Sequence, residues 1–240
     1  MAEDNVSRRR FLGQAGAVAG AAALGPAALA EAGKKQPKGQ APHPSTPGAA
    51  LAELRKGNRR YRRNRFELRD YSPVGEKRAE KQKPFAAIIT CADSRISPSL
   101  IFDLERGNIF VSKVAGNTID TGTLGSTEYA VAVLGVKLIM VLGHTDCGAV
   151  RSAIAVANGT ASYPPEQYGE IGAIIRPLLP PIATIPPDER TVDHGVAVNA
   201  RAQAADIAGR GPIIQPAIVA RKLRVVAAVY HIRTGRVRLV

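Results

Sequence analysis

The chain has 240 residues, of which 45% are hydrophobic, and this length is enough for one α/β domain with a substantial core. This composition excludes a disordered chain and a chain made mainly of membrane spans. The formal net charge of +13 raises the question of nucleic-acid binding, but much of the excess gathers in residues 55–69 without a nucleic-acid motif or an aromatic stacking platform. We therefore expect no nucleic acid as partner, and we interpret the basic stretch as a solvated helix face or an arm against a partner subunit.

Residues 1–30 are interpreted as an export signal. Paired arginines in Ser7–Leu12 precede an Ala- and Gly-rich run from Phe11 to Ala30, which ends in the small-residue pattern of a cleavage site. This arrangement resembles a twin-arginine signal, which implies export in the folded state to the periplasm or beyond the cell. The alternative is an uncleaved membrane anchor, because the run is long enough to span a bilayer. We favour cleavage after Ala30 and no stable membrane insertion afterwards.

A linker and then the folded domain follow. Residues 31–49 are rich in Lys, Pro, Gly, Ser and Gln and predict an unstructured linker. The domain is predicted over residues 50–240. Leu51 and Leu54 begin a short basic helix that Gly57-Asn58 is expected to end.

The rest of the chain alternates short apolar runs with helical segments. Runs of this kind are typical of buried parallel strands. Prolines between residues 160 and 188 predict only short helices and loops there. The fold class is α/β, with a central, mostly parallel sheet of four to five strands flanked by helices and an N-terminal helical arm. We predict strands at residues 85–90, 108–113, 137–142, 223–232 and 237–239, and helices at residues 97–105, 123–134, 148–157, 189–208 and 212–221.

Two short stretches carry the chemistry: residues 91–95 (CADSR) and residues 144–148 (HTDCG). Each follows a predicted strand, and sites in parallel sheets form outside the carboxyl ends of strands. Cys91, His144 and Cys147 offer two thiols and one imidazole, a set that suits tetrahedral Zn²⁺ and leaves one position open, as in a catalytic site. A disulfide between the two cysteines is the alternative, and the polar residues around each cysteine count against it.

Asp93 and Arg95 are interpreted as a functional pair beside this metal. The carboxylate can accept a hydrogen bond from water at the metal, and the arginine can keep it ionised and aimed. The alternative is an ordinary surface ion pair. Because two thiolates and a neutral imidazole neutralise Zn²⁺, we expect activity to rise through mildly alkaline pH, with Asp93 able to take the fourth position at low pH. Gly148 is expected to let the backbone approach the site.

These stretches resemble the β-class carbonic anhydrases over about residues 50–240. The resemblance is carried by residues 91–95 and 143–149 and supported by residues 115–117, residues 126–130, and Tyr230 with Thr234-Gly235. It implies one zinc per subunit, held by Cys91, His144 and Cys147, with Asp93 and Arg95 catalytic and Asp93 a conditional fourth ligand. It also implies a pocket at Gly116, Asn117 and Gly148, and reversible hydration of CO₂ to bicarbonate and a proton by attack of zinc-bound hydroxide.

The resemblance further implies a homodimer or a higher even oligomer in which the basic arm of residues 51–69 contacts the neighbour. The chain departs from the family at Lys113-Val114 and His231, and it has no tryptophan, so an allosteric bicarbonate pocket built on that residue cannot be carried over. Two alternatives stay open. One is a CS₂ or COS hydrolase with the same zinc ligands, and the other is a non-enzymatic binding protein in which zinc is only structural.

Overall fold

A computed structural model describes residues 43–67 and 82–240. The expected export signal at residues 1–30, the linker as far as residue 42, and the end of the basic arm lie outside these described residues. Within the described ranges, every helix is too short or too polar to cross a membrane.

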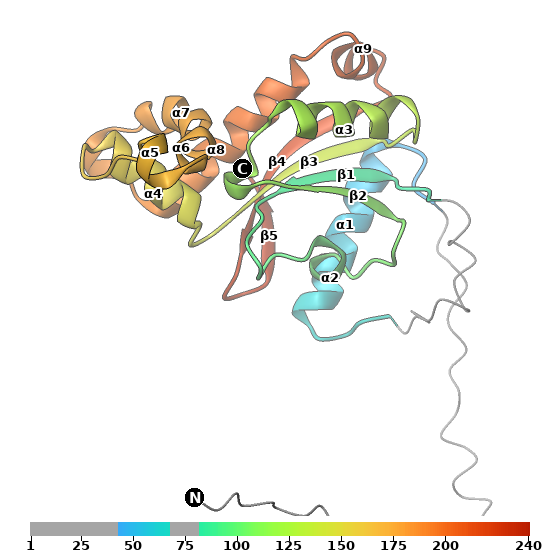
Figure 1. Ribbon diagram of the computed structural model, residues 1–240. Coiled ribbons are helices and arrows are strands. Elements are labelled where there is room, and N and C mark those ends of the chain that lie inside the picture. Colours follow the sequence, from blue (N-terminus) through green and yellow to red (C-terminus); the bar gives the residue numbers. More distant parts are fainter. Residues whose placement is uncertain (1–42, 68–81) are drawn as a thin grey trace, which may run out of the picture. The chain divides into compact units, whose positions relative to one another are not determined.

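A five-stranded sheet forms the centre of the domain, in the order β2-β1-β3-β4-β5 (Figure 1). The first four strands are parallel, and β5 runs antiparallel to β4. Every residue of β1 and β3 is buried, as expected for apolar strands covered on both faces. The predicted fold class is confirmed. The strands are β1 (Ala86–Thr90), β2 (Ile109–Lys113), β3 (Leu138–His144), β4 (Arg224–His231) and β5 (Arg236–Leu239).

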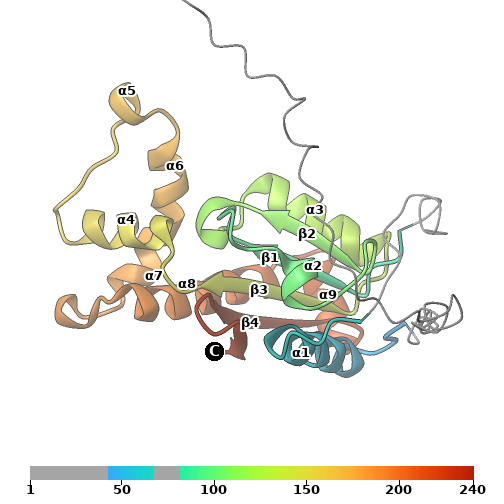
Figure 2. The same cartoon turned by 90° about the horizontal axis from the view of Figure 1, so that it is seen from below.

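Helices cover both faces of the sheet. On one face, α1 (Pro47–Arg62) and α2 (Pro98–Ile101) pack with strand residues in a first core cluster. On the other face, α3 (Thr121–Ala132), α8 (Val192–Ala208) and α9 (Ile214–Val219) enclose a second cluster. Figure 2 shows α1 and α3 on opposite sides of the strands. Residues that alternate along each strand therefore enter different cores.

A group of short helices lies at one end of the sheet against α8 (Figure 1). It encloses a third apolar cluster, which includes Cys91 and Cys147. The prolines in this region break the chain into short segments, as predicted. The group contains α4 (Gly148–Ala157), α5 (Pro165–Tyr168), α6 (Ile171–Ile175) and α7 (Leu179–Ala183), with 3₁₀ turns η3 (Arg176–Leu178) and η4 (Pro187–Glu189). A further turn, η2 (Ala115–Asn117), follows β2.

The first helix differs from the prediction at both ends. It begins at Pro47, capped by Thr46, so regular structure starts inside the segment expected to be linker. It ends at Arg62, so the prediction that Gly57-Asn58 ends this helix is wrong. A Cβ built on Gly57 would lie 1.7 Å from the carbonyl oxygen of Phe102, so this glycine permits close packing and does not end the helix.

One face of this helix packs on its own chain, because Leu51 and Leu54 are buried in the first core cluster. Asn58 is buried beside them and ties three segments together. Its amide nitrogen donates to the carbonyl oxygens of Ile101 and Gly235, and its oxygen accepts from the backbone N–H of Val237. The helix therefore fixes the loop after α2 and the turn between β4 and β5.

Substituting Gly57→Ala is expected to lower the free energy of unfolding by about 1–3 kcal/mol, because helix α1 must move away from Phe102 to admit the methyl group. Gly48→Ala, in the same helix, is the matched control, because a Cβ there meets no atom within 4 Å. Denaturant unfolding monitored by circular dichroism measures both. Equal stability of the two variants would contradict this packing role.

The other helix boundaries shift for local reasons. The helix predicted at 97–105 stops at Ile101, and Asp103 then takes a positive φ of 46°. The helix predicted from residue 123 begins at Thr121, where the Asp120 side chain accepts from the Thr123 N–H. The helix predicted at 189–208 begins at Val192 after a Thr191 cap, and the one predicted at 212–221 spans Ile214–Val219. Helix ends depend on such caps.

Candidate metal centre

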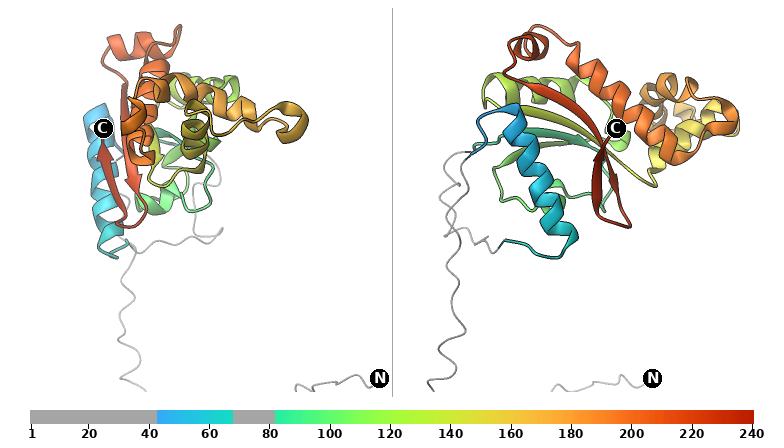
Figure 3. Two further views of the ribbon diagram at one scale, coloured as in Figure 1. Left: turned by 90° about the vertical axis from the view of Figure 1, so that its left-hand side faces the viewer. Right: turned by 180° about the vertical axis from the view of Figure 1, so that it is seen from behind.

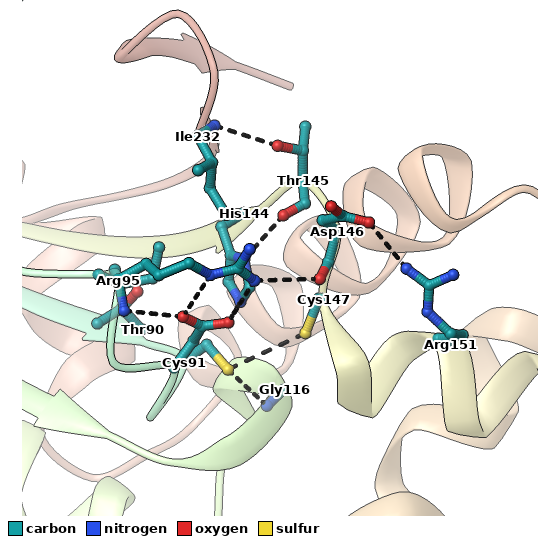
Figure 4. A network of polar contacts seen from close by, with 12 residues as sticks. Thr90, Cys91, Arg95, Gly116, His144, Thr145, Asp146, Cys147, Arg151 and Ile232 are labelled. Carbon is teal, nitrogen blue, oxygen red and sulfur yellow. Dashed lines mark hydrogen bonds and ion pairs between the residues drawn. The ribbon is translucent and has the colours of Figure 1, made fainter.

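Three potential metal ligands converge where β1 and β3 end. Cys91 follows β1, His144 is the last residue of β3, and Cys147 is the N-cap of α4. Their ligand atoms lie within 4.8 Å of one another, and all three residues are buried. Because β1 and β3 are neighbours in the sheet, two loops distant in sequence meet at one point, as the sequence predicts (Figure 4). His144 was expected just past β3, but its pairing with Tyr230 of β4 places it inside the strand.

The two cysteines are free thiols. Their sulfur atoms are 4.0 Å apart, about twice the S–S bond length, which rules out the disulfide alternative for this conformation. A separation of about 3.8 Å follows for two sulfurs bound at about 2.3 Å to one tetrahedral zinc. The thiols are therefore spaced as a pair of zinc ligands.

The His144 ring is held in the orientation that a ligand needs. Its Nδ1 lies 2.9 Å from the carbonyl oxygen of Thr145, so Nδ1 carries the proton and donates, which leaves the lone pair on Nε2. Nε2 is buried and has no hydrogen-bond partner among the described residues. Thr145 is itself fixed, since its N–H donates to the Tyr230 carbonyl. Its hydroxyl also accepts from the Ile232 N–H (Figure 4). A bound cation would satisfy the unpartnered nitrogen.

The electrostatics of the thiols favour a bound cation as well. The hydrogen bond from Cys147 lowers the pKa of the Cys91 thiol to about 4, with further contributions from His144 and the backbone at Asp93 and Gly116. The same contact with Cys91, together with burial, raises the pKa of Cys147. Burial is the largest single influence on His144 and opposes a charge there, but Cys91, the Thr145 backbone and the Asp93 charge together outweigh it and raise the pKa of the ring. Without a metal the pair therefore shares one proton, and a divalent cation would displace it.

The donor set fits zinc with one position left for a non-protein ligand. In residues 43–67 and 82–240, no fourth His, Cys, Asp or Glu joins the three ligand atoms. The Gly116 N–H donates to the Cys91 sulfur at 3.3 Å, which supports a thiolate there. A closed structural site would need four protein ligands, so this arrangement has the composition of a catalytic site.

Asp93 and Arg95 form a close pair beside these ligands. Arg95 donates from its backbone N–H and from Nε to Oδ1, and from Nη2 to Oδ2, at 2.7–3.0 Å. These hydrogen bonds lower the pKa of Asp93 to about 2. Asp93 Oδ2 lies 3.9 Å from His144 Nε2, and the Asp93 side chain is only 17% exposed. The carboxylate is thus ionised, aimed by Arg95 and adjacent to the metal ligands.

The three residues expected to form the pocket, Gly116, Asn117 and Gly148, have different surroundings in the structure. Gly116 has a φ of +73°, and a Cβ there would lie 2.9 Å from Leu178, so glycine is needed. Asn117 is buried, and its Nδ2 has no partner among the described residues. A Cβ on Gly148 would meet no atom within 4 Å, so this glycine borders open space and not a close backbone contact.

Several supporting residues were missed by the sequence reasoning. Asn199 of α8 is fully buried and donates to the Gly116 carbonyl at 2.9 Å. Gln203, one turn later, donates to Asn199 and accepts from the Ile119 N–H. The sequence offers one signal for this contact: Asn199 and Gln203 are amide side chains four residues apart, next to the apolar stripe of α8. They brace the η2 turn whose N–H contacts Cys91.

Lys113, at the end of β2, was noted only as a departure from the family pattern. Its ammonium group donates to the carbonyl oxygens of Asp93 at 3.2 Å and Ile96 at 2.8 Å. It therefore ties the loop that carries Asp93 and Arg95 to the neighbouring strand. The other three histidines stand apart from the three ligands. His43 Nε2 lies 2.6 Å from the Lys83 carbonyl, His194 Nδ1 lies 3.3 Å from the Glu189 carbonyl, and His231 is part-buried at the end of β4.

Known proteins with similar sequences share one activity name. A family model described as carbonic anhydrase matches residues 86–237. Carbonic anhydrase 2 of Mycobacterium tuberculosis is 36% identical over 196 residues, covering 80% of this chain and 92% of that protein. A carbonic anhydrase of Mycolicibacterium smegmatis is 34% identical, covering 81% of this chain and 94% of that protein.

Solved structures agree with the sequence relatives. The Coccomyxa β-carbonic anhydrase in complex with acetazolamide has a TM-score of 0.58 at 29% identity, covering 68% of this chain and 74% of that chain. A tetrameric β-carbonic anhydrase from Sordaria macrospora has a TM-score of 0.58 at 28% identity, covering 68% and 84%. Both similarities extend over most of each domain.

Proposed function

The chain belongs to the β-class carbonic anhydrases, zinc enzymes that hydrate carbon dioxide reversibly to bicarbonate and a proton, and from this premise we propose how its own residues take part. Cys91, His144 and Cys147 hold the zinc. The observation that carries this assignment is the buried His144 Nε2, which has no partner among the described residues and lies within 4.8 Å of both sulfurs. When bound there, zinc supplies Lewis acidity that lowers the pKa of water.

Asp93 and Arg95 orient the reacting water. The carboxylate accepts a hydrogen bond from it, and once the water has lost one proton to solvent, its free oxygen lone pair can attack the carbon of CO₂ and give bicarbonate. Arg95 keeps the carboxylate charged and in place through the two side-chain hydrogen bonds. At low pH, Asp93 would have to leave Arg95 to act as the conditional fourth ligand.

We propose that CO₂ reaches the metal from the side of Gly148, which is exposed and has open space next to Cys147. Gly116 and Asn117 are buried, and the Gly116 N–H contacts the Cys91 sulfur. The apolar third core lies behind Cys147. A small apolar substrate suits these surroundings.

Activity is expected to rise through mildly alkaline pH. The ligand set neutralises the charge of Zn²⁺, so the pKa of water at the site falls less than in a three-histidine site. Asp93, with a pKa of about 2, is ionised throughout the range and contributes no step to the rise. Stopped-flow hydration measured from pH 6 to 9 tests this, and a flat profile would contradict it.

Lys113→Met is expected to lower kcat for CO₂ hydration about tenfold, because the loop carrying Asp93 loses both anchoring hydrogen bonds. Lys113→Arg retains the donors and is expected to restore most of the rate. Zinc content and melting temperature should stay unchanged in both variants. Lys222→Met, at an exposed lysine before β4, is the matched control. A purely structural role would show as a lower melting temperature with kcat intact.

The activity itself is tested by assaying the purified protein with CO₂ and CS₂ side by side, together with its zinc content. We expect one zinc per chain and hydration of CO₂, with CS₂ turned over poorly. Preference for CS₂ would favour the hydrolase alternative. Full zinc without activity on either substrate would favour a non-enzymatic role.

The enzyme is proposed to be a homodimer or a higher even oligomer. Several exposed apolar side chains lie on β2, the edge strand of the sheet, and on the helices on either face: Val111 on β2, Leu100 on α2, and Tyr129 and Val133 at the end of α3. Exposed apolar side chains near an unpaired strand edge are typical of a subunit contact. The Sordaria structures are described as tetrameric. Light scattering after size-exclusion chromatography measures the assembly, and a monomer would contradict the proposal.

Export is proposed on sequence grounds. The arginine pair and the Ala-rich run of residues 7–30 support a twin-arginine signal that carries the folded, zinc-loaded protein to the periplasm or the exterior. Loading before export would protect both thiolates from oxidation. N-terminal sequencing of protein from cell fractions tests this proposal. A cytoplasmic protein that keeps residues 1–30 would contradict it.

A further inference from the structure

A hollow of about 250 Å³ lies between α1 and β5 and shares no lining residue with the metal centre. Figure 3, in its right-hand view, shows α1 crossing the face of the sheet beside β5. Its lining includes buried Leu54 and Met140 and part-buried Leu239. Five of its twelve lining residues are arginines: Arg55, Arg59, Arg62, Arg236 and Arg238.

These five arginines lack the acidic partners that a neighbouring arginine has. Arg60, on the same helix, lies within ion-pair distance of Glu53, Glu67 and Asp103. By contrast, none of the five lining arginines has an ion pair with any residue in the described part of the chain, and all five are exposed. Arg55, Arg59 and Arg62 are spaced i, i+4, i+7 and so form one stripe on α1. Like charges gathered in this way repel one another until an anion binds.

Simple structural explanations account for only part of the cluster. Arg59 and Arg62 lie in the last turn of α1, where cations interact favourably with the helix dipole. Arg236 and Arg238 belong to a strand, so this explanation does not reach them. A twofold axis that passes through the cluster would place two sets of these arginines against each other.

Residues 1–42 and 68–81 are also poor occupants of the hollow, because both segments carry a net positive charge. Residues 1–42 hold six Lys or Arg against three Asp or Glu, and residues 68–81 hold four against three. The hollow therefore calls for an anion that the chain does not supply. Guanidinium groups bind phosphate oxygens in a bidentate manner, and the small volume limits the ligand to a compact one.

We propose that the hollow between α1 and β5 is a binding site for a compact phosphate-bearing polyanion, of which inorganic pyrophosphate is the simplest form. Arg59 and Arg236 bind it from opposite walls, and the other three arginines add charge around the rim. The site is separate from carbon dioxide hydration. Its ligand is held by the fixed spacing of a helix and a strand and not by net charge alone.

Isothermal titration of the full chain with pyrophosphate at about 0.15 M salt tests the proposal, because that ionic strength screens non-specific attraction. We expect one site per chain, with the dissociation constant raised at least tenfold in the Arg59→Gln/Arg236→Gln variant. The control is Arg63→Gln/Arg65→Gln, which removes the same charge from exposed arginines that do not line the hollow. This control is expected to bind within twofold of the unchanged protein, and both variants should keep their hydration activity.

A second measurement on the unchanged protein guards against misfolding of the variants. Pyrophosphate is expected to protect Arg59 and Arg236 from modification by phenylglyoxal, read by peptide mass spectrometry, while Arg63 and Arg65 stay reactive. Equal loss of binding in both double variants, or uniform protection of all arginines, would mean attraction by net charge and would overturn the site. The absence of saturable binding would overturn it as well.

Discussion

Replacing Cys147 by serine is expected to remove zinc from the protein and to lower kcat/KM for CO₂ hydration by more than about a hundredfold. Loss of a residue that only supports a metal ligand costs about 10- to 100-fold, so loss of a ligand should cost more. Serine matches the shape of cysteine but is a poor zinc ligand at neutral pH. Zinc per chain, measured by mass spectrometry of metals, and stopped-flow hydration give the two readouts.

Circular dichroism of the same variant separates metal loss from unfolding. Cys147 is the N-cap of α4 but makes no side-chain capping hydrogen bond, so the helix should persist after substitution. The Cys147→Ser protein is therefore expected to be folded, poor in zinc and nearly inactive. Equal zinc content and equal activity in the two proteins would refute the ligand assignment.

Asp93→Asn is expected to leave zinc bound but to lower kcat/KM by about 10²–10⁴, the range for loss of a group that handles protons in the transition state. The amide keeps the size of the carboxylate and removes its charge. Asp146→Asn is the matched control, because Asp146 pairs with Arg151 in an exposed ion pair beside Cys147. A similar loss in both variants would show that only the local fold, and not the Asp93 carboxylate, matters.

The same variant has a consequence for acid stability. Arg95 holds the pKa of Asp93 at about 2, below its ordinary value of 3.8. The ionised carboxylate therefore stabilises the fold above about pH 4, and this contribution is lost as the pH falls toward 2. Asp93→Asn should flatten that part of the acid-unfolding curve. Because Arg95 is half exposed, with its side chain 48% accessible, solvent screening will keep the effect small.

The sequence predicted the sheet and the three ligands for related physical reasons. Buried parallel strands have sequences of short, nearly continuous apolar runs, and β1 and β3 match this pattern closely. Residues that follow such strands are brought to one edge by topology, so Cys91 and His144 could be placed together before any coordinates. The spacing of His144 and Cys147 around a strand-to-helix turn added the third ligand.

What the sequence did not predict depends on contacts between distant segments. Gly57 reads as a helix stop, but its role is set by the Phe102 carbonyl 45 residues later in the chain. The anchoring contacts of Lys113 and Asn199 likewise join residues 17 to 83 positions apart. Their side chains have no local pattern that identifies a partner. Such supports become visible only when the fold places donor and acceptor together.

The central claim is that two sulfurs and one imidazole of this chain bind a single zinc and leave one position for a small ligand. X-ray absorption at the zinc edge of the full protein measures this directly. The account predicts two sulfur neighbours at about 2.3 Å and two lighter neighbours at about 2.0–2.1 Å. A zinc with no sulfur neighbours, or with four, would contradict it.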